Sequence, residues 1–317
     1  MPRLSRIAAG LGLGAGAIVA GTALAARAAE KAVPADGRFL HLDGERIHYT
    51  DEGSGPPLVL IHGLGGQMRN FSHGMTERLT DDFRVVSIDR TGSGHSSRSS
   101  PLSAGLERQA AAVARVIEAL ALDRPTVVGH SLGGAVALRL AADRPDLVGA
   151  LALVAPLTQV VTEPPEVFKP LAIRSRAARR AIAWTVATPS SLLRGKETLA
   201  LVFGPETPPD DWATRGGGYL GLRPSAYLNA SDDLQAMESD MPSLVTAYDR
   251  VTAPTGVLYG RGDLILDAEM HGGVAQQVAG AELELVDGGH MLPVTQPQET
   301  ADFIRRVAAR RADQPAG

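Results

Sequence analysis

The segment Thr126-Val127-Val128-Gly129-His130-Ser131-Leu132-Gly133-Gly134 decides the fold of this 317-residue chain. A β-branched run precedes the serine, a helical pattern follows it over Ala135–Ala142, and glycines flank it on both sides. The spacing G-x-S-x-G is typical of a sharp strand-to-helix turn, which needs small neighbours because its backbone is strained and crowded. Such a turn sets the serine hydroxyl at a helix N-terminus, whose dipole favours negative charge. We therefore predict that Ser131 is a nucleophile rather than part of an ordinary glycine-bounded turn.

Outward from this turn, short β-branched or leucine-rich runs alternate with longer helical patterns. The predicted strands are Leu58–Ile61, Arg84–Asp89, Thr126–Gly129 and Ala150–Val154, and the clearest predicted helices are Leu106–Leu120 and Leu132–Asp143. A hairpin is expected before them, over Phe39–Leu42 and Arg46–Thr50. Alternation of this kind indicates an α/β fold with a mostly parallel sheet and helices on both faces.

The alternation stops near Thr158. Residues 158–243 contain proline clusters and helical stretches without a convincing strand, and strand patterns resume at Gly256–Tyr259 and Leu283–Val286 before a final helix near Glu299–Arg310. A connection of that length is far longer than an ordinary loop. We predict one α/β domain, formed by residues 36–157 and 244–312, that is interrupted by a helical insertion over residues 158–243.

A second motif, Ile61-His62-Gly63-Leu64-Gly65-Gly66, follows an early strand, and Asp89-Arg90-Thr91-Gly92-Ser93-Gly94-His95-Ser96 follows the next one. Together with the serine turn, these motifs resemble the α/β-hydrolase family over about Phe39 to Arg310. The resemblance implies an α/β-hydrolase fold with an eight-stranded, mostly parallel sheet and a helical cap. It also implies that the backbone amides of Leu64 and Leu132 form an oxyanion hole, and that the Asp89 loop is structural.

A serine hydroxyl needs a base, and the base needs an orienting partner. Among the eight histidines only His290 follows a late strand directly after two glycines, as in the family's terminal G-G-H. The resemblance also picks out Asp263 in Gly260-Arg261-Gly262-Asp263 as the acid, with Asp267 and Asp287 as weaker candidates. The resulting chain order Ser131, Asp263, His290 is that of this fold. We expect His73 and His271 to be solvated surface residues.

Composition excludes several classes of function. The 31 basic and 35 acidic residues give a net charge of −4, so the chain has no basic excess for binding nucleic acid. The chain has no cysteine, which excludes thiol nucleophiles and thiolate metal sites. No zinc or calcium motif is present, and we expect neither a metal nor a cofactor.

The N-terminus differs from the rest. Two arginines precede an uncharged run, Ile7–Ala26, and small residues around Ala28 offer cleavage sites. This pattern favours a signal or membrane-anchor segment over residues 1–30, and hence an exported or membrane-anchored protein rather than a cytoplasmic one. A disordered alanine-rich tail is the alternative. Membrane association through residues 7–26 follows as an expectation, whereas the oligomeric state cannot be read from the sequence.

Scarce aromatic residues gather in the insertion. Both tryptophans, Trp184 and Trp212, lie there with Phe168, Phe203, Tyr219 and Tyr227. They either line a pocket for an apolar substrate or form the insertion's own core.

The sequence therefore predicts a serine hydrolase that cleaves an apolar carboxylic ester through an acyl-enzyme. Other chemistry on the same three residues remains open: thioester, lactone or carbon–carbon hydrolysis, cofactor-free perhydrolysis and acyl transfer. A ligand-binding protein that keeps the scaffold without catalysis is the alternative from another class.

Overall fold

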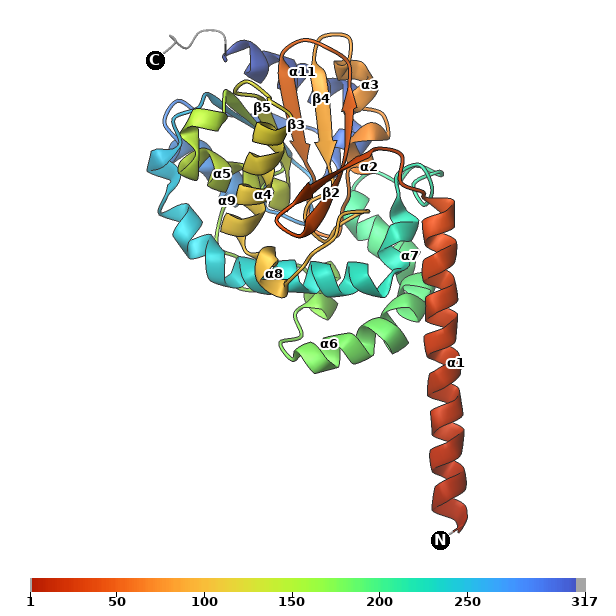
Figure 1. Cartoon of the computed structure of the whole chain (residues 1–317). Helices are drawn as coiled ribbons and strands as arrows, with labels where there is room; N and C mark the ends of the chain where they lie inside the picture. The colour runs from red at the N-terminus through yellow and green to blue at the C-terminus, as the bar shows by residue number, and fades with distance from the viewer. Residues whose placement is uncertain (1, 312–317) are drawn as a thin grey trace.

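The computed structural model describes residues 2–311, and its centre is an eight-stranded sheet (Figure 1). The strands are β1 (Arg38–Leu42), β2 (Glu45–Glu52), β3 (Pro57–Ile61), β4 (Arg84–Ile88), β5 (Thr126–His130), β6 (Ala150–Val154), β7 (Thr255–Gly260) and β8 (Glu282–Val286). Their order in the sheet is β1-β2-β4-β3-β5-β6-β7-β8. The β1–β2 and β2–β4 pairs are antiparallel and the other five pairs are parallel. The predicted mostly parallel, eight-stranded sheet is confirmed.

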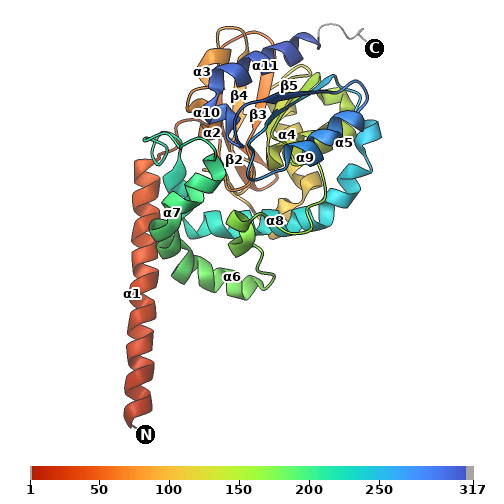
Figure 2. The same cartoon turned by 180° about the vertical axis from the view of Figure 1, so that it is seen from behind.

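Both faces of the sheet are buried at its central strands β3, β5, β6 and β7, which explains why these strands are rich in apolar residues. Along β3, Val59 and Ile61 join the core cluster beneath α4 (Leu106–Ala119) and α5 (Leu132–Asp143). Leu58 and Leu60 point to the other face, where α3 (Thr76–Leu79) and α11 (Pro297–Ala309) lie. Figure 2 shows this second face with α11 in front. The short helices α2 (Arg69–Ser72), α9 (Ala268–Gly272) and α10 (Leu292–Thr295) complete the two layers.

The insertion between β6 and β7, which we call the cap, is helical. Its main helices are α6 (Arg176–Ile182), the π-helical turn η4 (Ala183–Ala187), α7 (Thr188–Phe203) and α8 (Pro224–Val245), with the 3₁₀ turns η3 (Glu166–Leu171) and η5 (Gly218–Leu222). Phe203 and Trp212 pack edge to face at 4.9 Å between ring centroids and form a small apolar cluster with Met291 and Val294, which follow β8. The exact division of the chain into core and cap stays a prediction.

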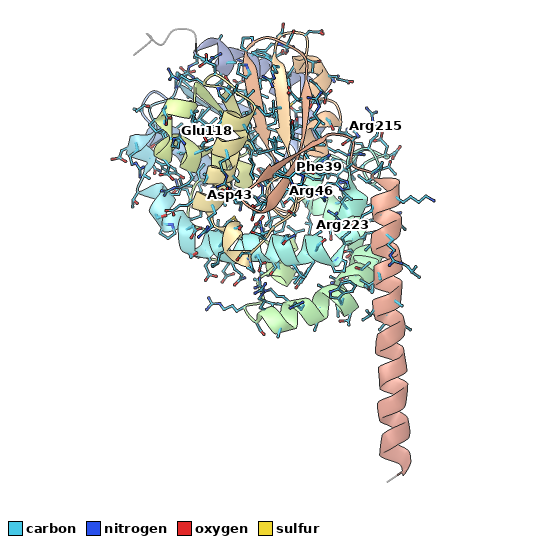
Figure 3. All side chains as sticks on the ribbon, viewed as in Figure 1. Phe39, Asp43, Arg46, Glu118, Arg215 and Arg223 are labelled. Atoms are coloured by element: carbon cyan, nitrogen blue, oxygen red, sulfur yellow. The ribbon has the colours of Figure 1, made fainter. Side chains whose placement is uncertain are left out.

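The N-terminal helix α1 (Pro2–Ala32) packs its last third against η4, α7 and η5 and projects away from the sheet (Figure 1). Thr22, Ala29 and Val33 are buried at this contact, and Glu30 lies 3.6 Å from Arg223 (labelled in Figure 3). The residues and side chains described do not include Met1 or the side chains of residues 2–13 and 15, so part of the predicted signal or anchor segment lies outside them. Within the part that is described, no helix combines the length and the apolar character needed to cross a membrane.

Candidate active site

Ser131 occupies a strained turn at the carboxyl end of β5. Its φ of 54° and ψ of −122° lie in a region that residues other than glycine rarely adopt, and such strain is often kept at functional sites. Hydrogen bonds hold the turn on both sides: the Ser131 amide donates to Val154 O at 3.1 Å, and its carbonyl accepts from the Leu157 amide at 2.9 Å. The neighbouring parallel strand therefore fixes the direction of the serine side chain.

The glycines of the motif are required by close backbone contacts. A β-carbon on Gly129 would lie 2.6 Å from the carbonyl oxygen of Gly133. One on Gly133 would lie 2.0 Å from the carbonyl oxygen of Ile61, at the end of β3. Any side chain at either position would push α5 away from the sheet and displace Ser131.

Asp263 and His290 form a buried pair in the loops after β7 and β8. Nδ1 of His290 lies 2.7 Å from Oδ2 of Asp263, while Oδ1 accepts the amides of Ile265 and Leu266 at 2.8 and 2.9 Å. Burial raises the pKa of Asp263, but the attraction and hydrogen bond of His290 and the two amides outweigh it, so the pKa is lowered overall. The carboxylate is therefore charged at neutral pH, and it orients the imidazole ring with Nε2 facing away from it.

The structure brings His290 beside the serine turn. Nε2 of His130 donates to the carbonyl oxygen of His290 at 2.9 Å, and the two rings lie 4.9 Å apart. Burial lowers the pKa of His130 to about 3, so this contact stays uncharged. Within residues 2–311 no hydrogen bond joins the Ser131 hydroxyl to His290, a bond that is often long without substrate and tightens on binding.

The loop after β3 lies directly against Ser131. A β-carbon on Gly63 would lie 2.8 Å from that of Ser131, and Leu64 and Leu132 border the same cavity as the serine. Within the described chain, the amides of Leu64 and Leu132 have no hydrogen-bond acceptor. The two donors are therefore free to bind an oxygen atom in front of Ser131.

The cavity at Ser131 has a volume of about 260 Å³ and is lined mostly by apolar side chains of the cap and the loops. They include Leu157, Phe168, Leu234, Met237, Met241, Ile265 and Leu266. Of the cap aromatics only Phe168 lines it, whereas Phe203 and Trp212 pack against Met291 and Val294 of the α/β core and Trp184 is exposed. A larger cavity, of about 530 Å³, lies beside it over Met270 and His271, and contains none of the three candidate residues. Across residues 2–311 no three potential metal ligands cluster together.

Two expectations about histidines are wrong. His271 is 2% exposed, and its Nδ1 accepts the amides of Thr158 and Gln159, each at 3.2 Å, where the cap leaves the sheet. His73 is mostly buried and lies 2.8 Å from the carboxylate of Asp211 in the cap. Both contacts join segments more than 100 residues apart, so no local pattern could reveal them.

Sequence reasoning also missed a buried ion-pair cluster that contacts the loop after β3. Arg90, in the motif after β4, contacts the carbonyl oxygens of His62 and Gly63 and the carboxylate of Asp233 on α8. The motif holds Arg90, but Asp233 lies in a helix without any motif, so its partner becomes visible only in three dimensions.

Comparison with known proteins agrees with this geometry. A family model described as alpha/beta hydrolase fold matches residues 56–297. The dihydrolipoyllysine-residue acetyltransferase component of an acetoin cleaving system from Cupriavidus necator is 40% identical over 133 residues, which cover 41% of this chain and about a third (34%) of that protein. RutD of Rhizobium rhizogenes, described as a carbamate hydrolase, is 27% identical over 84% of this chain and 98% of its own length.

A solved structure extends the likeness to the whole chain. The crystal structure of a bacterial membrane phospholipase A superimposes with a TM-score of 0.66 at 22% identity, and covers 99% of this chain and 100% of its own. At that identity the likeness concerns the fold. Since the family model spans most of the sequence and RutD, which matches over most of this chain, is named as a hydrolase, the chain is a hydrolase that belongs to the alpha/beta hydrolase fold family.

Proposed function

We propose that this hydrolase cleaves a carboxylic ester with an apolar acyl or alcohol part. The observation that carries the proposal is the position of Ser131: it opens into a cavity with apolar walls, and the Asp263–His290 pair lies at its side. A cavity with mostly apolar walls and a few convergent polar groups suits a small apolar substrate.

The proposed mechanism assigns one task to each residue. Ser131 Oγ attacks the ester carbonyl carbon while Nε2 of His290 takes the hydroxyl proton, and Asp263 stabilises the charged imidazole. The amides of Leu64 and Leu132 donate to the oxygen that becomes negative, where one lost donor typically costs about 3 kcal/mol. His290 returns the proton to the leaving alcohol, then activates a water molecule that attacks the acyl-enzyme and releases the acid.

The names of the similar proteins support acyl chemistry but do not indicate which type of bond this protein cleaves. Their names mention a phospholipase A, a carbamate hydrolase and an acetyltransferase component. We favour a carboxylic ester because the charged side chains that line the cavity, Arg174 and Glu238, are largely exposed to solvent and pair with each other at 2.9 Å, which leaves the rest of its wall uncharged. The alternative reactions use the same three residues: hydrolysis of thioesters, lactones or carbon–carbon bonds, perhydrolysis and acyl transfer. Assays with the corresponding substrates distinguish them from ester hydrolysis.

A fluorophosphonate probe tests the proposal on the full-length protein. We expect a covalent adduct on Ser131, located by mass spectrometry, and none on the Ser131→Ala variant. Nitrophenyl esters from acetyl to lauroyl then define the preferred chain length. A folded protein that the probe leaves unlabelled would contradict the proposed mechanism and favour a ligand-binding function.

We also propose that the protein associates with a membrane through residues 7–26. Their uncharged sequence supports this location, as do the exposed Trp184, Val186, Leu192 and Leu193 on the cap elements beside α1. Flotation with lipid vesicles tests it: the full chain should float, whereas a variant starting at residue 31 should stay with the soluble fraction. Equal distribution of both proteins would contradict the proposal.

A further inference from the structure

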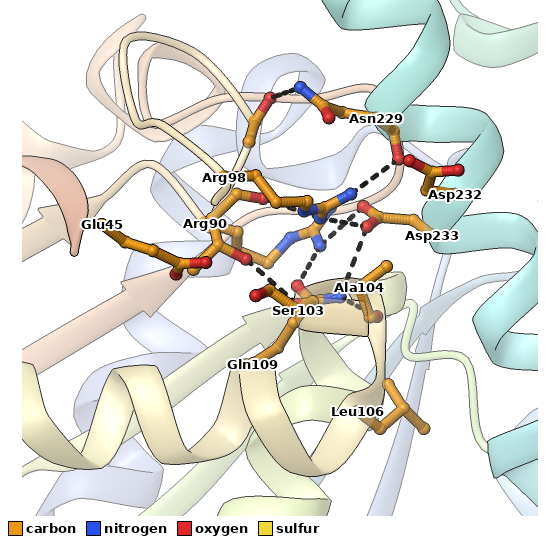
Figure 4. Close-up of polar contacts among 12 residues, drawn as sticks. Glu45, Arg90, Arg98, Ser103, Ala104, Leu106, Gln109, Asn229, Asp232 and Asp233 are labelled. Carbon is orange, nitrogen blue, oxygen red and sulfur yellow. Dashed lines mark hydrogen bonds and ion pairs between the residues drawn. The ribbon is translucent and has the colours of Figure 1, made fainter. Parts of the chain in front are cut away.

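A buried cluster of two arginines and one aspartate joins the cap to the core. Asp233 lies on α8, whereas Arg90 and Arg98 lie in the segment after β4, and all three side chains are at most 2% exposed. One oxygen of Asp233 accepts from Nη1 of Arg90 at 3.0 Å, and the other accepts from Nη2 of Arg98. Figure 4 shows both guanidinium groups converging on this one carboxylate. The cap is therefore tied to the core by charges that have no access to water.

In this cluster Asp233 is the residue that supplies negative charge. Two neighbouring guanidinium groups share its single negative charge, and the amide side chain of Gln109 adds only a neutral acceptor. Removing one partner from a buried ion pair is strongly unfavourable, because the remaining charge is left without compensation. Loss of Asp233 would therefore make Arg90 and Arg98 repel each other, and Arg90 would shift.

Arg90 in turn helps to hold the loop after β3, together with the Gly66 amide and Nδ1 of His62, which also contact the Gly63 carbonyl oxygen at 3.2 and 2.9 Å. Nε of Arg90 donates to the carbonyl oxygen of His62 at 2.9 Å, and its Nη2 donates to that of Gly63 at 2.8 Å. The Gly63 carbonyl and the Leu64 amide belong to one planar trans peptide, in which C=O and N–H point in opposite directions. A hydrogen bond that fixes the Gly63 oxygen therefore also fixes the direction of the Leu64 N–H.

We propose that Asp233 is a positioning residue that acts through Arg90 to aim the Leu64 amide at the substrate's carbonyl oxygen. The position of α8 on the core would then determine how well the oxyanion hole stabilises negative charge. The cap would therefore contribute to the rate of acylation as well as to substrate choice. This inference rests on the proposed function, which assigns the Leu64 amide to the oxyanion.

The preceding residue of the same helix provides a matched control. Asp232 also forms a buried ion pair, with Arg179 at 2.7 Å, and both of these residues belong to the cap. Asp233→Asn and Asp232→Asn each remove one carboxylate charge from α8 without changing side-chain size. Only Asp233→Asn removes a group that contacts Arg90, and Arg90 connects this helix to the loop that carries Leu64.

Steady-state kinetics with a preferred ester compare the two variants. We expect Asp233→Asn to lower kcat about 10- to 100-fold while KM changes little, because a misdirected donor costs at most what a lost donor costs, about 10²- to 10³-fold. The affinity for an arylboronic acid, which forms a negatively charged tetrahedral adduct on serine, should fall by a similar factor. Asp232→Asn should keep both values within about twofold of the wild type.

The outcomes separate this inference from the proposed function. A wild-type protein that neither reacts with the fluorophosphonate nor hydrolyses esters would disprove the function itself. If the wild type is active and Asp233→Asn keeps its kcat, or if both variants lose kcat equally, the positioning role is wrong. Should Asp233→Asn not fold, the double variant Asp233→Asn/Arg98→Met removes the repulsion between the two guanidinium groups and should fold. Its kcat should still lie below that of Arg98→Met alone, because Arg90 has lost the carboxylate that holds it; equal kcat values in these two variants would disprove the positioning role.

Discussion

The loops at the end of the sheet and the cap above them are built by different kinds of interaction. At the sheet, Ser131 directly follows β5, and Asp263 and His290 come three and four residues after β7 and β8. In the cap, the important contacts join distant segments: Asp233 reaches Arg90, and Glu206 accepts the amide of Gly289 at 3.0 Å beside His290. The difference shows that local turns place the proposed reacting groups, whereas tertiary contacts align and cover them.

The largest expected effect tests the sheet side of this comparison. Asp263→Asn should lower kcat about 10⁴-fold, because the amide cannot hold the imidazole in the required tautomer or stabilise its charge. Circular dichroism and thermal unfolding should show a folded protein, since Asn keeps an oxygen that can accept the amides of Ile265 and Leu266.

Asp267→Asn is the control for this experiment. Asp267 caps α9 by accepting the Met270 amide at 2.6 Å and lies four residues from Asp263. Asn is also a good N-cap, so stability should change by less than about 1 kcal/mol and kcat should stay near that of the wild type. A loss of kcat as large in Asp267→Asn would mean that the acid is wrongly assigned.

The cap side is tested by changing the size of the cavity. Met237, on α8, lines the cavity at Ser131, so Met237→Ala should shift the preferred acyl chain toward longer esters and Met237→Phe toward shorter ones. One methylene in an apolar pocket changes kcat/KM by about 10- to 200-fold, which sets the upper limit of the shift. Chain-length profiles of kcat/KM measure the effect.

Met270 offers the control for cavity size. It lines the neighbouring cavity, away from Ser131, and Met270→Ala should leave the chain-length profile unchanged. Equal shifts in both variants would mean that the substrate binds elsewhere.

The same division explains how much the sequence could predict. The mostly parallel sheet and the choice of Asp263 and His290 could be predicted, because the motifs place each of these residues shortly after the end of a strand. The roles of His73, His271 and Asp233 could not be predicted, because their partners lie more than 100 residues away. The cap aromatics show a third case: Phe168 lines the cavity, Phe203 and Trp212 pack against Met291 and Val294, and Trp184 is exposed, and composition does not encode which of these positions each one takes.

The smallest expected effect concerns the point where the cap leaves the sheet. Burial lowers the pKa of His271 from 6.5 to about 4, and its neutral Nδ1 accepts the amides of Thr158 and Gln159. Between these two pH values the unfolded chain binds a proton that the folded protein does not. The free energy of unfolding therefore falls as the pH drops from 6.5 toward 4, by about 1.4 kcal/mol per pH unit for this residue, and its full contribution is present above pH 6.5.

Urea unfolding at several pH values between 4.5 and 7 measures this contribution. Other buried histidines add to the slope of the wild type, since burial lowers the pKa values of His62 and His130 to about 3 as well. The comparison with His271→Asn isolates one residue, because Asn can still accept an amide through Oδ1 but does not titrate. We expect a slope smaller by about 1.4 kcal/mol per pH unit in the variant. Equal slopes in the wild type and the variant would show that His271 is protonated to the same extent in the folded protein as in the unfolded chain. The hydrogen bonds at the start of the cap would then not depend on its neutral form.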